Sequence, residues 1–218
     1  MGLIVLQADE TLEGDMRVLL SDAPGPVYVS RIPSAPMVTP ETLTDMADDL
    51  QHAAALLPDA RPYGVIGYGC TSASAVIGSD KVAQIVKSGA PVAEVTNPLR
   101  ATIACAAHHG ISRLALISPY IESVNAPLRT AFAAAGVSTE VFGSFGIAEE
   151  AKVVRISADS LLEAGRKLGA DPAVEGVFLS CTNLRTLPVL DRLAKELGKP
   201  VMSSNQALGW HMQRLNAA

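Results

Sequence analysis

Two stretches decide the fold: Gly64-Val-Ile-Gly-Tyr-Gly-Cys70-Thr71 in the first half of the chain and Gly176-Val-Phe-Leu-Ser-Cys181-Thr182 in the second. Each is a short apolar run that ends in a Cys-Thr pair. Short apolar runs of this kind, each followed by a stretch with helical spacing, are typical of buried parallel strands. We therefore predict that each stretch is a strand with a cysteine at its carboxyl end.

The similarity between these two stretches extends along the whole chain. Cys70 and Cys181 are separated by the same number of positions as Leu3 and Leu114, so the chain is a tandem repeat. Strands are predicted at residues 3–6, 27–29, 64–67, 92–95, 114–117, 140–142, 176–179 and 201–203. Helices are expected between them, including residues 74–78 after the first cysteine and 187–197 after the second.

The alternation of strands and helices predicts an α/β fold. We expect two similar three-layer α/β/α lobes with mainly parallel sheets, related by a pseudo-twofold axis, with the active-site cleft between them. The first lobe would span residues 1–108 and carry Cys70. The second would span residues 109–218 and carry Cys181, with its final helix free to pack back on the first lobe.

Composition excludes several classes of protein. The chain has 218 residues, 49% of them hydrophobic and 18% charged, and a net charge of −5. It has no basic stripe for nucleic acid and no apolar run of the roughly 18–20 residues that cross a membrane. We therefore expect a cytoplasmic protein that binds neither. The mean hydropathy of +0.27 suits a homo-oligomer, a dimer or higher.

Three cysteines do not make a disulfide framework, and no Cys/His spacing typical of a metal site is present. Cys105 lies in an apolar helical stretch, where packing explains it. Cys70 and Cys181 are either small buried hydrophobic residues or reactive thiols. Their matched positions favour reactive thiols, each at a strand's carboxyl end and beside a helix amino terminus, where a thiolate or a carboxylate is stabilised.

Small polar residues follow both cysteines and are suited to bind a substrate carboxylate or oxyanion. They are Thr71 and Ser72 in the first half and Thr182 and Asn183 in the second.

Five motifs in order resemble the aspartate/glutamate racemase superfamily. They are Gly2-Leu-Ile-Val with Asp9, Thr11 and Glu13; Gly67-Tyr-Gly-Cys-Thr-Ser; Ser118-Pro-Tyr120 with Asn125; Leu179-Ser-Cys-Thr-Asn-Leu-Arg-Thr; and Met202-Ser-Ser-Asn-Gln-Ala-Leu-Gly-Trp-His. Within the superfamily they are most similar to the maleate cis-trans isomerase and arylmalonate decarboxylase branch and to the racemase-like proteins of ectoine utilisation.

The resemblance implies an isomerase that needs no metal or organic cofactor and acts on a small carboxylate substrate. By this resemblance Cys70 is the nucleophile or first base, and Cys181 is its acid partner. Tyr120 is implied as a hydrogen-bond donor to a substrate carboxylate, with Thr71, Ser72 and Thr182 as carboxylate or oxyanion ligands.

Departures from the family patterns leave alternatives open. Racemases of the superfamily commonly have His where this chain has Asn183, and arylmalonate decarboxylases keep only the second cysteine, which disfavours both activities. Maleate isomerases have Asn where this chain has Asp9 and, later, Glu149 or Glu150. Asp9 either binds a substrate ammonium or caps a helix. Three alternatives to the cis-trans isomerase therefore remain. They are a two-base racemase or epimerase of an amino or hydroxy acid, including one derived from ectoine; an arylmalonate-type decarboxylase; and a non-catalytic carboxylate-binding protein.

Overall fold

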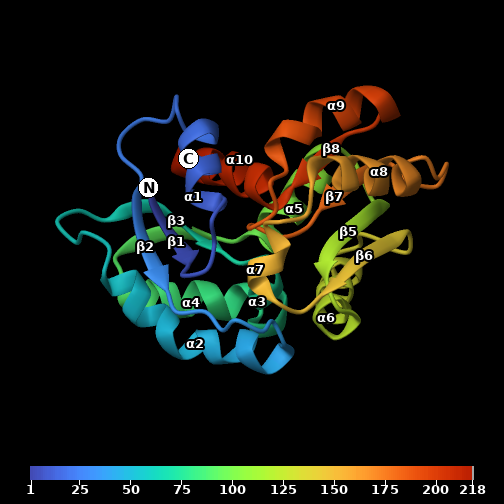
Figure 1. The fold of residues 1–218 in the computed structure, drawn as a ribbon. Helices are drawn as coiled ribbons and strands as arrows, with labels where there is room; N and C mark the ends of the chain where they lie inside the picture. The colour runs from blue at the N-terminus through green and yellow to red at the C-terminus, as the bar shows by residue number, and fades with distance from the viewer. Residues whose placement is uncertain (218) are drawn as a thin grey trace.

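The computed structural model describes residues 1–217 and contains two four-stranded parallel sheets (Figure 1). The strand order is β2-β1-β3-β4 in the first sheet and β6-β5-β7-β8 in the second. The two orders are equivalent, since β5 follows β4 along the chain and takes the place of β1. The expected α/β class with parallel sheets is confirmed.

The elements alternate along the chain as the repeat predicts. The first half contains β1 (Gly2–Leu6), α1 (Leu12–Leu19), β2 (Tyr28–Ile32), α2 (Pro40–Ala55), β3 (Tyr63–Gly69), α3 (Thr71–Ile77), α4 (Ser79–Gly89), β4 (Val92–Thr96) and α5 (Pro98–His108). The second half contains β5 (Leu114–Tyr120), α6 (Glu122–Ala134), β6 (Phe142–Ile147), α7 (Glu150–Val153), α8 (Ala158–Gly169), β7 (Gly176–Leu179), α9 (Leu187–Leu197), β8 (Val201–Ser203) and α10 (Ser204–Asn216).

All eight predicted strands are present, but the bounds of two edge strands were wrong. The expected 27–29 is Tyr28–Ile32, and the expected 140–142 overlaps Phe142–Ile147 only at its end. Both strands carry weak strand signals. β2 includes the polar Ser30 and Arg31, and β6 contains Gly143 and Gly146, a residue type that is depleted in strands.

The final helix, α10, packs against β3, α1 and α5 of the first half (Figure 1). Its Leu208 and Met212 belong to an apolar cluster with residues of β1 and β3. Gly67 in β3 allows this close approach, because a Cβ there would lie 2.6 Å from the Met212 sulfur. The chain thus crosses back over the first sheet at its end.

No helix within residues 1–217 combines the length and the apolar character needed to cross a membrane.

Candidate functional site

Cys70 lies at the carboxyl end of β3 and is the N-cap residue of α3. Its Sγ accepts a hydrogen bond from the Ala73 N–H at 3.4 Å, and the Ser74 hydroxyl donates to its carbonyl at 2.5 Å. The helix begins at Thr71 rather than at the predicted residue 74, because the sulfur itself caps the first turn. Cys70 therefore has the expected position at a helix amino terminus.

Cys181 follows β7, but it does not lie beside the amino terminus of α9. That helix begins at Leu187 with Thr186 as its N-cap, so the prediction of a matching helix terminus was wrong for the second half. Cys181 instead has φ 125, a left-handed backbone conformation that is strained for a residue with a side chain. Two hydrogen bonds hold it: its N–H donates to Ser204 Oγ at 2.9 Å, and the Asn183 N–H donates to its Sγ at 3.4 Å. Strain of this kind is common at functional sites.

Hydrogen bonds join the two Cys-Thr pairs directly. The Thr182 hydroxyl donates to the carbonyl of Gly69 at 3.2 Å, across the boundary between the halves. The Thr71 hydroxyl lies 2.8 Å from Ser204 Oγ, the same oxygen that accepts the Cys181 N–H. All of these groups are buried. The two cysteines, one at the end of each sheet, are therefore held in one shared region.

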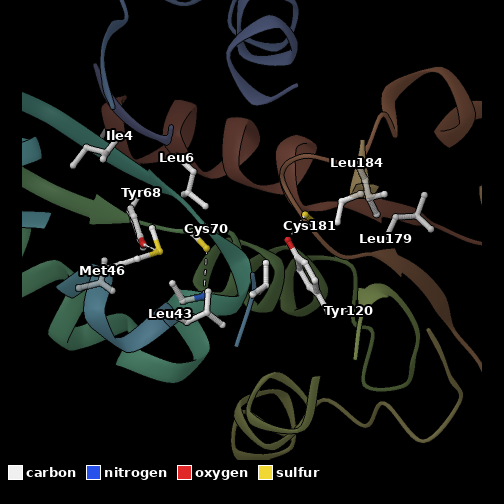
Figure 2. Packing of buried hydrophobic residues seen from close by; sticks show 14 of the residues in the cluster. Ile4, Leu6, Leu43, Met46, Tyr68, Cys70, Tyr120, Leu179, Cys181 and Leu184 are labelled. Atoms are coloured by element: carbon white, nitrogen blue, oxygen red, sulfur yellow. Dashed lines mark hydrogen bonds between the residues drawn. The ribbon is translucent and has the colours of Figure 1, made fainter. Parts of the chain in front are cut away.

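Tyr120, at the end of β5, lies between the two thiols (Figure 2). Its hydroxyl donates to Glu150 Oε2 at 2.8 Å and is 3.1 Å from the Cys181 sulfur. The Tyr120 side chain lines the same cavity as Cys70. Tyr120, Cys70 and Cys181 belong to one apolar cluster that includes residues of both sheets. The Tyr120 hydroxyl donates to Glu150 in this structure, and its implied role as a donor to a substrate carboxylate stays a prediction.

Asn183 connects this group to the loop after β1. Its Nδ2 donates to Glu150 Oε1 at 2.9 Å, and its Oδ1 accepts the Glu10 N–H at 2.9 Å. Its backbone carbonyl accepts the Thr11 hydroxyl at 3.1 Å. Asn183 therefore positions Glu150 and fixes the loop that carries Asp9.

The two carboxyl oxygens of Asp9 differ in their hydrogen bonding. Oδ1 accepts the N–H groups of Thr11 and Leu12, at 2.8 and 2.7 Å, and so caps the first turn of α1. Oδ2 is buried and has no hydrogen-bond partner among residues 1–217. The predicted capping function is thus present, and the alternative role in binding a substrate ammonium stays a prediction.

Burial dominates the electrostatics of the site. Burial, with smaller contributions from the nearby Glu150 and Asp9, raises the pKa of the Cys70 thiol to about 12 and that of Cys181 well above its usual range. Burial also raises the pKa of the Asp9 and Glu150 carboxyls. The N–H groups of Ala73 and Ser72 oppose the shift at Cys70. This closed form therefore holds both cysteines as thiols at neutral pH.

The cavity beside Cys70 is small, about 20 Å³, and its lining includes Tyr120 and Glu150. That volume accommodates roughly one water molecule. The segment before α2 covers it: the Val38 N–H donates to the carbonyl of Ala148 at 2.8 Å, and the Glu150 N–H donates to the carbonyl of Pro36 at 3.0 Å. A larger hollow of about 640 Å³ lies along α6 and contains neither cysteine among its lining residues.

All eight predicted site residues are buried around this region: Asp9, Cys70, Thr71, Ser72, Tyr120, Cys181, Thr182 and Asn183. The hydroxyls of Thr71 and Thr182 form hydrogen bonds between the halves. No group of three or more His, Cys, Asp or Glu side chains within that part of the chain is arranged to hold a metal ion.

Two residues of the site were not predicted. Ser204 was part of a quoted motif without a role, and its contacts with Cys181 and Thr71 are long-range. Glu150 could not be separated from Glu149 in the sequence. A signal was present, since Glu150 shares a helical face with Val153 and Val154, and all three are buried.

The family to which the sequence belongs follows from comparison with known sequences. The chain is a member of the arylmalonate decarboxylase family, whose sequence model matches residues 2–218.

Within this family the chain is similar to maleate isomerases over nearly its full length. The maleate isomerase of Nocardia farcinica (strain IFM 10152) is 26% identical over 222 residues, 98% of this chain and 88% of that protein. The arylmalonate decarboxylase of Bordetella bronchiseptica is 33% identical over 107 residues, 49% of this chain and 45% of that protein. A structure of the Nocardia farcinica enzyme with a covalently bound succinylcysteine intermediate has the same fold, with a TM-score of 0.87 and 24% identity over 98% of this chain and 91% of that one.

Proposed function

We propose that this chain is a cofactor-independent isomerase of the maleate cis-trans isomerase type, acting on a small unsaturated dicarboxylate. The observation that carries the proposal is the pair of hydrogen-bonded links between the halves, from Thr182 to Gly69 and from Thr71 through Ser204 to Cys181. These links hold two thiols from equivalent strands in one buried region, where Tyr120 contacts Cys181 and lines the cavity beside Cys70. The succinylcysteine intermediate in the related maleate isomerase structure supports the same chemistry.

Cys70 is the nucleophile in this proposal. Its thiolate adds to one carbon of the double bond, and the neighbouring carbon takes a proton from Cys181. Rotation about the resulting single bond, return of the proton to Cys181 and expulsion of Cys70 give the trans isomer. The helix α3 supports this assignment, because the N–H groups of Ser72 and Ala73 are directed at the Cys70 sulfur and stabilise its thiolate.

The substrate carboxylates would bind at the amino end of α3 and in the turn after Cys181. We assign Ser72 to this task together with Thr71, Thr182 and Asn183. Binding requires the cover over Cys70 to open, because the closed cavity has a volume of only about 20 Å³. Opening admits water and removes part of the burial that raises the pKa of Cys70, so the thiolate forms when the site is accessible.

The test is proton NMR of the wild-type protein with maleate in deuterated water. We expect fumarate to appear, with no obligatory incorporation of deuterium. Cys70→Ser is expected to abolish the reaction, whereas Cys105→Ser, which changes a cysteine outside the site, is expected to retain it. Failure of the wild-type protein to isomerise maleate or any other unsaturated dicarboxylate of a panel would overturn the proposal.

A second candidate, a two-base racemase or epimerase, is favoured by the charges of the site. Asp9 and Glu150 are both buried carboxyl groups, and Asp9 Oδ2 lacks a partner. The nearby Arg31 is already engaged, donating to the carbonyls of Leu6 and Asp9 and pairing with Glu13. A dianionic ligand would be repelled by ionised carboxylates here, whereas a substrate ammonium would be stabilised.

The same NMR panel separates the two candidates. Amino acids, including those derived from ectoine, would incorporate deuterium at the α-carbon if two cysteines exchange its proton. An arylmalonate in the panel would reveal decarboxylation. A chain that binds these carboxylates and turns over none of them would be a binding protein.

We also propose that the protein is cytoplasmic and forms a homo-oligomer. A reducing, cytoplasmic environment suits three free cysteines. A homo-oligomer would cover the exposed Tyr28 and Val29 on the edge strand β2. Light scattering coupled to size-exclusion chromatography measures the assembly, and a monomer would contradict this part of the proposal.

A further inference from the structure

A chain of hydrogen bonds leads from the Cys181 sulfur through Tyr120 to Glu150. The Tyr120 oxygen is 3.1 Å from the sulfur and 2.8 Å from Glu150 Oε2. Figure 2 shows the Tyr120 hydroxyl oxygen directed at Cys181. All three residues are at least nine-tenths buried, so water does not compete for these bonds.

Asn183 fixes which oxygen of Glu150 can carry a proton in this chain. The backbone N–H of Glu10 can only donate, so the Asn183 atom that it meets at 2.9 Å is the oxygen. The other end of the amide is then the NH2 group, which donates to Glu150 Oε1 at 2.9 Å. Glu150 is thus arranged as an acceptor at Oε1, and an ionised Glu150 accepts the Tyr120 proton at Oε2.

This direction determines the state of Cys181. Tyr120 has one proton, which goes to Glu150, so its oxygen can only accept from the thiol of Cys181. In the opposite arrangement Glu150 is protonated and donates to Tyr120, and Tyr120 donates to a Cys181 thiolate. Both arrangements use the same heavy-atom positions.

We propose that Glu150 is the proton partner of Cys181, which exchanges its proton with this carboxylate through the Tyr120 hydroxyl. The S–H bond of Cys181 breaks as a new O–H bond forms on Tyr120, and the original Tyr120 O–H bond breaks as an O–H bond forms on Glu150. In total, one proton leaves Cys181 and one reaches Glu150, and the negative charge moves from Glu150 to Cys181. The net charge of the site is unchanged. Glu150 is a positioning residue in this scheme, since it acts through Tyr120.

The negative charge rests on Glu150, because the pKa of Cys181 is raised well above that of an ordinary thiol whereas that of Glu150 is raised from the lower value of a carboxyl, so the thiolate arrangement is the minor form. Burial raises the pKa of both Glu150 and Cys181, and the same neighbour, Asp9, raises both. Cys70 faces the region from the first sheet and is also held as a thiol. The Asn183 NH2 and N–H groups stabilise the charge on Glu150 and on the sulfur, respectively.

The exchange matters for either reaction proposed above. A charged Glu150 keeps Cys181 as a thiol that is ready to protonate a carbon, and a protonated Glu150 leaves a thiolate that is ready to accept a proton. This purpose rests on the proposed function. The exchange itself takes place without substrate and can be measured apart from turnover.

The test is a pH titration of the Cys181 Cβ resonance by NMR, with carbon-13 cysteine incorporated into a Cys70→Ser/Cys105→Ser chain. Removing the Glu150 charge, and letting the new amide donate to Tyr120, turns the Tyr120 hydroxyl toward the sulfur. We therefore expect Glu150→Gln to lower the Cys181 midpoint by about one pH unit or more. The matched control is Glu149→Gln, at the exposed neighbour that pairs with Lys152, and it is expected to leave the midpoint in place.

A second variant keeps the test decisive if Glu150→Gln does not fold. Tyr120→Phe removes the hydroxyl that stabilises the thiolate, and it is expected to raise the Cys181 midpoint. An unchanged midpoint in Tyr120→Phe, or equal shifts in Glu150→Gln and Glu149→Gln, would overturn the proposal. Because no substrate is present, loss of the predicted shifts is distinguishable from failure of the isomerase assay.

Discussion

Ser204→Ala tests the links between the halves, because Ser204 Oγ contacts both the Cys181 N–H and the Thr71 hydroxyl. Removing this oxygen leaves a buried N–H without an acceptor, which costs about 1–3 kcal/mol. The Thr71 hydroxyl loses its partner as well, at about 0.5–1.5 kcal/mol. We therefore expect the free energy of unfolding to fall by about 2–4 kcal/mol.

The assay is urea unfolding followed by circular dichroism, with an unchanged dependence on denaturant as the sign that the folded state is intact. Thermal unfolding is expected at a temperature about 5–10 °C lower. Thr71→Val should lower the free energy of unfolding by less, about 0.5–1.5 kcal/mol, because the Cys181 N–H still donates to Ser204 Oγ. The Ser204→Ala/Thr71→Val double variant should be about as stable as Ser204→Ala alone, because each single substitution already removes the hydrogen bond between Thr71 and Ser204.

The matched control is Ser88→Ala, at an exposed hydroxyl that bonds the Gln84 carbonyl within α4. We expect it to change stability by less than about 0.5 kcal/mol. The reasoning would be refuted if Ser204→Ala were as stable as this control, or if the two substitutions at Ser204 and Thr71 were additive.

Two further predictions concern access to the site and its pH dependence. Met37 and Glu149 face each other as an isolated antiparallel bridge in the cover, so a Met37→Cys/Glu149→Cys variant should form a disulfide. Oxidation is expected to reduce turnover by at least about tenfold and reductant to restore it, whereas full activity of the oxidised form would show that the cover need not open. Because the pKa of Cys70 is raised to about 12, folding stability should be complete below the ordinary thiol pKa and decline as the pH rises toward 12. In alkaline urea titrations Cys70→Ser should lessen this decline by about 1.4 kcal/mol per pH unit, and an unchanged slope would contradict the raised pKa.

The elements that the sequence predicts well are those with strong local patterns. The core strands at Gly176–Leu179 and Val201–Ser203 and the helix at Leu187–Leu197 have the predicted bounds, because each is a short apolar run or an amphipathic stretch with clear ends. β6 was misplaced because its glycines and serine resemble a turn. Its position depends on pairing with β5, which no local pattern encodes.

The candidate site was predictable where the repeat marks it and not where distant segments meet. Cys70 and Cys181 are matched between the halves, so the sequence identifies both. The positive φ of Cys181 has no local signature, and the Cys181 N–H donates to Ser204, which lies far along the chain at the start of α10. The buried Glu150 accepts hydrogen bonds from Tyr120 and Asn183, which lie on other segments of the chain, and neither contact has a sequence signature.

Trapping of a covalent adduct tests most directly whether the two thiols act on one small molecule. A Cys181→Ser chain lacks the group that takes the proton back and completes turnover, so addition of Cys70 to maleate, with a proton from water on the neighbouring carbon, should leave a succinyl adduct on Cys70 that peptide mass spectrometry reveals. An adduct on Cys105, or none on Cys70 while the wild-type chain isomerises maleate, would contradict the account.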